Sequence, residues 1–159
     1  MPRAKKPPLS FVEQMKKLIA SGINDSPKIV VKDDSDALTP LEERVQDILG
    51  LSDNARKRKD RMLFFVMYDI ESDKVRRLVV KYLIREGCTR IQKSIFLADR
   101  PVATYNKIKS DLAEVQAVYD NEDSIIVLPV TTDYLRMMKV IGKNIDVDII
   151  THNKNTLFF

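Results

Sequence analysis

The stretch that most constrains the fold is an apolar run from Met62 to Ile70, with the sequence Met-Leu-Phe-Phe-Val-Met-Tyr-Asp-Ile. It is rich in aromatic and branched side chains, is closed by Asp69 and is followed by the polar turn Glu71-Ser72-Asp73. A short apolar run bounded by turn formers is typical of a strand buried on both faces. We therefore expect the rest of the chain to cover this strand, and its exit to hold the Asp69 carboxylate in a fixed, accessible place.

The residues after this run alternate between helical and extended patterns. Apolar residues spaced by three and four follow Ser72, a good N-cap, and the pattern stops at Gly87. The segment Thr89 to Ala98 alternates as β structure, and its periodicity fits either one strand or a tight pair. A second, longer helical pattern begins near Pro101.

The next apolar run, Ser124 to Val130, contains a proline that limits where the strand can lie. Pro129 has no N–H to donate to a ladder, so that end of the strand belongs at a sheet edge. The order of elements predicts an α+β fold, a ferredoxin-like βαββαβ sandwich with an antiparallel sheet and both helices on one face. The last strand of that unit lies at the edge, where Pro129 is tolerated.

Beyond this unit the sequence predicts a short helix and an extra C-terminal strand. The helix is expected to be capped by Thr132 and to end at Gly142, with Leu135, Met138 and Ile141 on its apolar face. The strand is expected where Ile145, Val147 and Ile149 alternate with two aspartates.

The final segment, Thr156-Leu157-Phe158-Phe159, is apolar. Such a segment needs a surface to cover it, and we expect it to pair with a second subunit. Leu157 and Phe158 are therefore predicted at the interface of a homodimer.

Residues 1–61 are predicted to be an N-terminal extension of the main domain, which covers residues 62–159. Helical spacing begins at Phe11 and stops at Gly22, and a second helix is predicted from Thr39, as N-cap, to Gly50. Two short amphipathic helices bury little by themselves, so we expect them to pack on the main domain or on a partner.

A basic run, Arg56-Lys57-Arg58-Lys59-Asp60-Arg61, joins the extension to the main domain. It is either a solvated linker or a strap that contacts phosphates. Residues 1–61 hold 13 Lys or Arg against 10 Asp or Glu, and residues 62–159 hold 14 against 13. Nucleic-acid binding by the main domain therefore requires local basic patches rather than bulk charge.

The composition excludes several kinds of site. One cysteine, Cys88, allows no internal disulfide, and one histidine, His152, allows no multi-histidine site within one chain. The chain has only four glycines and lacks a phosphate loop or a dinucleotide-binding turn. No apolar run approaches the roughly 20 residues of a membrane span, and no secretory signal is visible, so we expect a cytoplasmic protein.

Asp69 is the strongest candidate for a catalytic or metal-binding residue. One carboxylate per chain makes a poor metal site, because Mg²⁺ is usually held by one or two carboxylates together with waters and a phosphate. Two chains that bring their Asp69 residues together would remove that shortfall. Metal-assisted phosphodiester hydrolysis is then one hypothesis, and a turn or capping role for Asp69 is the other.

Five short pieces of the main domain form one pattern: Tyr68-Asp69-Ile70, Arg76-Arg77, Gly87, Arg90 to Phe96, and Asp123-Ser124-Ile125 leading to Pro129. Taken together, their residues and spacing resemble the CRISPR-associated protein two family, the small adaptation proteins described as endoribonucleases. The resemblance covers roughly residues 62 to 150. The chain departs from the family at Leu97, where an acid is common, and in residues 1–61.

The resemblance implies a homodimer of ferredoxin-like domains whose C-terminal strands cross between subunits, with Arg90-to-Lys93 and Ser94-to-Asp99 as two short strands. It also implies that Asp69 is the catalytic acid and binds a Mg²⁺ ion shared by the two chains, with Phe96 and Arg90 near the dimer centre. The expected nucleic-acid contacts are basic residues of the first domain helix, the strand pair and the linker: Lys74, Arg76, Arg77, Lys81, Arg90, Lys93, Arg56 and Arg58.

Two functions remain open from the sequence. In the first, the dimer binds duplex prespacer DNA and bridges CRISPR integrase subunits during spacer acquisition in antiviral defence. In the second, it is a Mg²⁺-dependent endonuclease that cleaves RNA or DNA through Asp69 at the dimer interface. A basic stripe along the first domain helix favours the first hypothesis, and Asp69 alone motivates the second.

Overall fold

The computed structural model describes residues 7–21, 37–55, 59–118, 122–142 and 145–148. The elements are α1 (Phe11–Ala20), α2 (Leu41–Ala55), β1 (Arg61–Asp69), α3 (Asp73–Arg85), β2 (Thr89–Gln92), β3 (Ile95–Pro101), α4 (Val102–Gln116), β4 (Ser124–Pro129), α5 (Thr132–Met137), β5 (Lys139–Gly142) and β6 (Ile145–Asp148). Ile149, the last position of the predicted C-terminal strand, and the tail with Leu157 and Phe158 lie outside the described residues.

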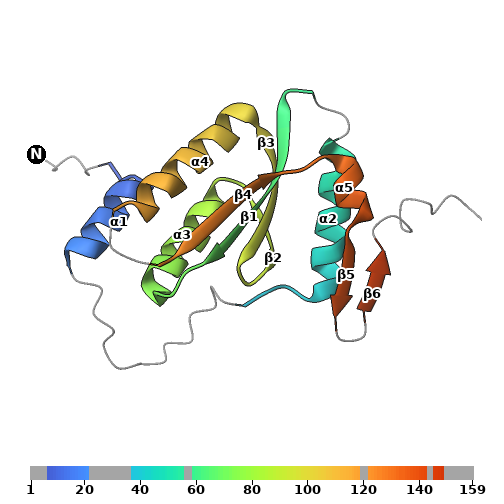
Figure 1. Ribbon diagram of the computed structural model, residues 1–159, viewed down its shortest axis with the longest axis horizontal. Helices are drawn as coiled ribbons and strands as arrows, with labels where there is room; N and C mark the ends of the chain where they lie inside the picture. The colour runs from blue at the N-terminus through green and yellow to red at the C-terminus, as the bar shows by residue number, and fades with distance from the viewer. Residues whose placement is uncertain (1–6, 22–36, 56–58, 119–121, 143–144, 149–159) are drawn as a thin grey trace, which may run out of the picture.

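The main sheet is antiparallel, with the strand order β2-β3-β1-β4. This order and the intervening helices α3 and α4 confirm the ferredoxin-like prediction, and β4 with Pro129 lies at the sheet edge as expected. The strand pair implied by the resemblance is also confirmed as β2 and β3. Figure 1 shows α1, α3 and α4 on one side of the sheet, and α2, α5 and the β5–β6 hairpin on the other.

The central strand β1 is covered on both faces, as its apolar sequence predicts. Phe64, Val66 and Tyr68 belong to a core cluster that includes residues of α3 and α4. The alternate residue Leu63 belongs to a second cluster with Ile48 of α2. Because successive side chains of a strand point to opposite faces, a strand covered on both sides has to be apolar throughout.

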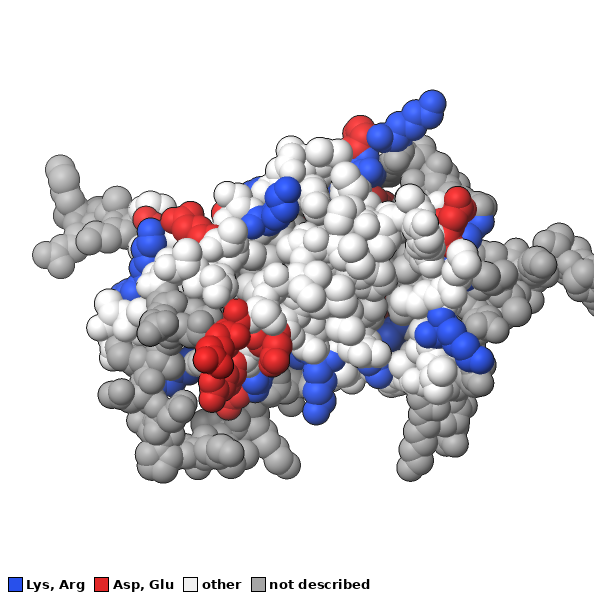
Figure 2. Space-filling view, viewed as in Figure 1, with Lys and Arg blue, Asp and Glu red and all other residues white. Residues whose placement is uncertain are grey.

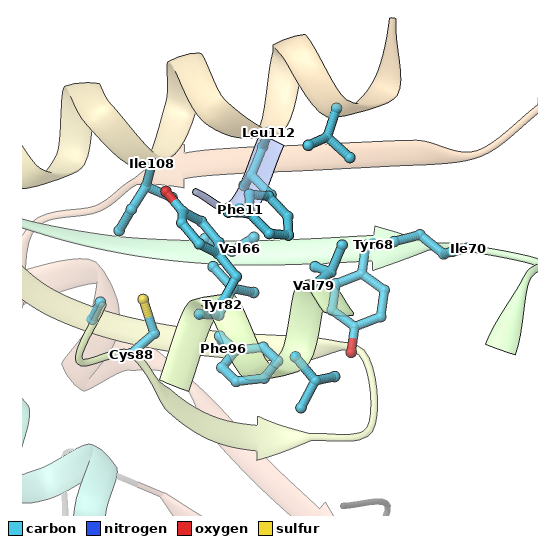
Figure 3. Close-up of a cluster of buried hydrophobic side chains, with 14 of the residues drawn as sticks. Phe11, Val66, Tyr68, Ile70, Val79, Tyr82, Cys88, Phe96, Ile108 and Leu112 are labelled. Atoms are coloured by element: carbon cyan, nitrogen blue, oxygen red, sulfur yellow. The ribbon is translucent and has the colours of Figure 1, made fainter. Parts of the chain in front are cut away.

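The N-terminal extension is part of both cores. Phe11 of α1 stacks on Tyr82 of α3 with 4.0 Å between ring centroids, and Met15 is fully buried in the same cluster. Figure 3 shows Phe11 beside Tyr82 in that cluster. On the opposite face, Arg44 of α2 donates a hydrogen bond from Nη1 to the Ile91 carbonyl at 2.6 Å. The helices of the extension therefore pack on the main domain, one on each side of the sheet.

The end of α2 differs from the prediction. Gly50 does not stop this helix, which continues to Ala55. A helical glycine costs about 1 kcal/mol relative to alanine, which burial of neighbouring residues offsets. Val45 and Ile48, which precede Gly50 in the same helix, are buried and hold the helix in place. The strand that follows, β1, begins at Arg61.

The predicted short helix near residue 132 is also wrong in its extent. Its N-cap is Thr131, whose hydroxyl accepts a hydrogen bond from the Tyr134 N–H, and it ends at Met137. The predicted helical position Ile141 instead lies in β5, opposite Asp146 of β6. Short apolar runs fit both helical and strand periodicity, and here pairing with β6 makes residues 139–142 a strand. The extra C-terminal strand is thus half of a hairpin.

Candidate nucleic-acid interface

The site is built around the exit of β1. Asp69 is the last residue of this strand, pairs in register with Ser124 of β4, and has an exposed side chain. Three residues later Ser72 caps α3 by accepting a hydrogen bond from the Val75 N–H. The sequence thus fixes the Asp69 backbone between a paired strand and a capped helix, and leaves its carboxylate accessible.

A hollow of about 370 Å³ lies at this exit. Residues from three segments line it: the end of β1, the first turn of α3, and the β2–β3 region. They are Tyr68, Asp69, Ile70, Arg76, Arg90, Lys93 and Ser94. The structure therefore brings together four of the residues that the sequence predicts for the site, Asp69, Arg76, Arg90 and Lys93.

Arg76 joins the beginning of α3 to the end of β1. Its Nη1 donates to the Ile70 carbonyl at 3.2 Å, and its Nη2 pairs with the Asp73 carboxylate. A guanidinium presents several donors in a fixed plane, so one arginine can hold both groups at once. Arg76 consequently positions one wall of the hollow as well as contributing positive charge to it.

The turn between β2 and β3 is fastened to β1 through two of its carbonyls, and that of Ser94 accepts a hydrogen bond from the Tyr68 N–H at 3.0 Å. The Lys93 oxygen accepts from the Tyr68 hydroxyl at 3.0 Å and from two guanidinium nitrogens of Arg90, Nε at 3.1 Å and Nη2. The Arg90 guanidinium also lies over the Phe96 ring, 5.9 Å from its centroid. Arg90 therefore positions the turn that carries Lys93 and Ser94 beside Asp69.

Removal of one of these bonds has a measurable cost. We expect Tyr68→Phe to lower the free energy of unfolding by about 1 kcal/mol, because it deletes a partly buried hydrogen bond and leaves the ring in place. Chemical denaturation of the purified protein measures this. The matched control is Tyr134→Phe. Tyr134 is 71% exposed, so removal of its hydroxyl should leave the free energy of unfolding unchanged. Equal stability of Tyr68→Phe and the wild type would show that the hydroxyl does not hold the turn.

Three further predicted contacts lie along α3, outside the lining of the hollow. Lys74 and Lys81 are exposed, and Arg77 is half-buried and donates from Nε to the Asp73 carbonyl at 3.3 Å. Figure 2 shows charged side chains around the margins of one face and a largely uncharged middle. Arg56 and Arg58 lie outside the described residues.

Phe96 belongs to the protomer's own core. Its side chain is fully buried, and its ring lies 6.3 Å from that of Tyr68, between centroids. Any contact between two copies near this point has to be made by the residues around Phe96. Leu157 and Phe158, the other predicted interface residues, are not among those described.

A single protomer does not fit a magnesium ion. Among the described residues no group of three or more His, Cys, Asp or Glu side chains could hold a metal. The hollow contains one carboxylate, that of Asp69, beside three cationic side chains. A Mg²⁺ site at this position would therefore need a second carboxylate from another copy of the chain.

Tyr68 and Ser94 line the hollow but are not among the site residues predicted from the sequence. Tyr68 precedes Asp69 and would by strand alternation point away from it, into the core. Its ring is indeed buried, but its hydroxyl reaches the Lys93 carbonyl. Ser94 lies in a turn whose position depends on the pairing of β2 with β3. The adjacency of both residues to predicted ones was the available signal.

Comparison with known proteins finds a matching family. No helix among the described residues is both long and apolar enough to cross a membrane. No curated protein matches the chain. The family model described as CRISPR associated protein Cas2 matches residues 62–138, which span β1 to the end of α5. Residues 62–138 are therefore a domain of the CRISPR-associated protein Cas2 family, which supports a general role in CRISPR adaptation.

Proposed function

We propose that the protein acts in spacer acquisition as a homodimer that binds duplex prespacer DNA and bridges integrase subunits. The observation that carries the proposal is the gathering of Arg76, Arg90 and Lys93 around one hollow, with Lys74 and Lys81 exposed on the adjoining helix α3. Lys and Arg contacts to phosphates position a protein on a duplex without reading its sequence. Such contacts suit a protein that has to accept prespacers of any sequence.

Dimerisation is supported by the surface of β4. This strand is at the edge of the main sheet, and its Ile126 and Leu128 side chains are 55% and 46% exposed. An exposed sheet edge with apolar side chains is a ready site for association. β4 crosses the middle of the view in Figure 1, where Figure 2 shows a largely uncharged surface.

The test is the salt dependence of duplex binding by the purified protein. If several phosphates are contacted, the logarithm of the association constant should fall linearly with the logarithm of salt concentration, with a slope of about −0.9 per contact. Duplexes of unrelated sequence should bind with equal affinity. Absent binding, or affinity that is insensitive to salt, would count against the proposal.

The alternative is a Mg²⁺-dependent endonuclease that acts on RNA or DNA. The exposed carboxylate of Asp69 in the hollow favours it, and the need for a second carboxylate requires the ion to be shared by the two Asp69 residues of a dimer. This proposal therefore fails if the protein cleaves nucleic acid as a monomer.

Asp69→Asn separates the two functions. Under the endonuclease proposal it should abolish Mg²⁺-dependent cleavage, because the amide is neutral and binds the ion poorly, while dimerisation stays intact. Cleavage of labelled RNA and DNA, with the oligomeric state measured by light scattering, checks both. Cleavage that persists in the mutant would point to a contaminating nuclease. Asp133→Asn on α5 serves as the matched control, because the Asp133 side chain is exposed and does not line the hollow.

A further inference from the structure

The hollow at the exit of β1 holds an acidic side chain among its cations. Arg76, Arg90 and Lys93 line it together with Asp69, whose side chain is exposed. A carboxylate and a DNA phosphate are both negative, and both only accept hydrogen bonds, so the two groups repel each other at short range. Asp69 therefore opposes the phosphate binding that the three cationic side chains favour.

The charge of Asp69 is not balanced by a partner in the part of the chain that the structure describes. No hydrogen bond or ion pair is found there at its carboxylate. Arg76 instead pairs with the Asp73 carboxylate of α3. Arg90 donates from Nε and Nη2 to the Lys93 carbonyl. An approaching phosphate therefore meets the negative charge of Asp69 without a neutralising neighbour bound to it.

The backbone on both sides of Asp69 is held in place. Asp69 pairs in register with Ser124 of β4, and the N–H of the preceding Tyr68 donates to the Ser94 carbonyl at 3.0 Å. Three residues later, Ser72 caps α3. Because an aspartate side chain is short, a fixed backbone keeps its carboxylate at the hollow. The repulsion is therefore a built-in property of the site.

We propose that Asp69 is a repulsive element of the DNA interface, which keeps the affinity for duplex DNA below the level that the cations of the hollow would give alone. The inference rests on the proposed binding of duplex DNA at this hollow. A protein that binds any sequence through charge also has to release the DNA, and affinity differences within one interface lie mostly in the dissociation rate. We therefore expect the carboxylate to speed dissociation of the duplex. This role requires no chemical step at Asp69.

The duplex affinity of two Asp69 variants tests the proposal. The full chain is compared as wild type, Asp69→Asn and Asp69→Glu by fluorescence anisotropy with a labelled duplex at about 50 mM salt. EDTA is present, so that no divalent cation bridges a carboxylate and a phosphate. Asp69→Asn removes the charge and nearly keeps the shape, and it should bind roughly threefold to tenfold more tightly, mainly through slower dissociation. Asp69→Glu keeps the charge and should bind within about twofold of the wild type.

Two controls separate the position of the charge from its amount. Asp133→Asn makes the same change of net charge on α5, which follows the end of β4 that pairs with Phe64, away from Asp69. It should change the affinity by less than about twofold. Raising the salt to about 300 mM should shrink the advantage of Asp69→Asn, because salt screens repulsion between exposed charges. A local change of shape would not fade in this way.

The outcomes distinguish this inference from the function on which it rests. If the wild type does not bind duplex DNA, the proposed function fails and the inference fails with it. If the wild type binds with the expected salt dependence but Asp69→Asn binds equally or more weakly, DNA binding stands and the repulsive role of Asp69 is overturned. An equal gain in Asp69→Glu or in Asp133→Asn would overturn it as well, because the charge at this position would then not explain the effect.

Discussion

Replacement of Lys74, Arg77 and Lys81 together by glutamate is expected to weaken duplex DNA binding by roughly 100-fold or more at about 100 mM salt. Each phosphate contact that is lost reduces the number of counterions released on binding, and each new carboxylate is repelled by the DNA phosphates. These residues share one helix, and two of them are exposed. The slope of binding against salt should become shallower in the variant. Fluorescence anisotropy with a labelled duplex measures both quantities.

The matched control makes the same change of net charge elsewhere on the helical side of the molecule. Lys16 and Lys17 of α1 and Lys109 of α4 are all exposed. Their replacement by glutamate should weaken binding several-fold at most, through the long-range field alone. An equal loss in both triple variants would assign the effect to bulk charge and would remove α3 from the interface.

Replacement of Arg61 by methionine is expected to lower the free energy of unfolding by about 3 to 5 kcal/mol, because it leaves a buried carboxylate without its partner. Arg61 Nε lies 3.2 Å from Asp99 Oδ2, and the two side chains are 17% and 5% exposed. Its Nη2 also donates to the Asp99 carbonyl, which joins β1 to β3 at their ends. Urea denaturation monitored by circular dichroism measures the loss.

A second substitution distinguishes the cost of the orphaned charge from loss of packing. Arg61→Met combined with Asp99→Leu removes both charges, and replacement of a whole buried pair by apolar residues is often close to neutral. The double variant should therefore recover most of the stability. A double variant as unstable as Arg61→Met alone would show that the arginine stabilises the protein through contacts other than its ion pair.

Much of the fold follows from the sequence because its signals are local. Ser72 and Gly87 bound α3 as predicted, and Gly87 takes the left-handed conformation, with φ of 84°, that glycine adopts without strain. Pro129 places β4 at an edge through the missing N–H. Local patterns failed at Gly50, where tertiary burial of α2 outweighs a weak helix breaker, and at residues 139–142, where strand pairing with β6 outweighs helical spacing.

The sequence singled out four of the residues around the hollow, but not Tyr68 and Ser94 and not the roles of the members. Asp69, Arg76, Arg90 and Lys93 line one hollow, an arrangement that depends on the fold of the chain. The sequence could not show that Arg90 donates to the Lys93 carbonyl, because this bond depends on how the β2–β3 turn folds back. It also could not show that Phe96 is buried within the protomer, because the same alternation fits either face of β3.

The central claim is that the protein acts as a DNA-binding scaffold in spacer acquisition, and that the chemistry of Asp69 is not required. Spacer acquisition in cells that carry the matching integrase tests this most directly, with wild type, Asp69→Asn and the triple glutamate variant of α3 compared side by side. We predict that Asp69→Asn acquires spacers like the wild type, and that the α3 variant does not. Loss of acquisition in an Asp69→Asn protein that still dimerises and binds duplex DNA would contradict the claim and would assign a chemical role to the carboxylate.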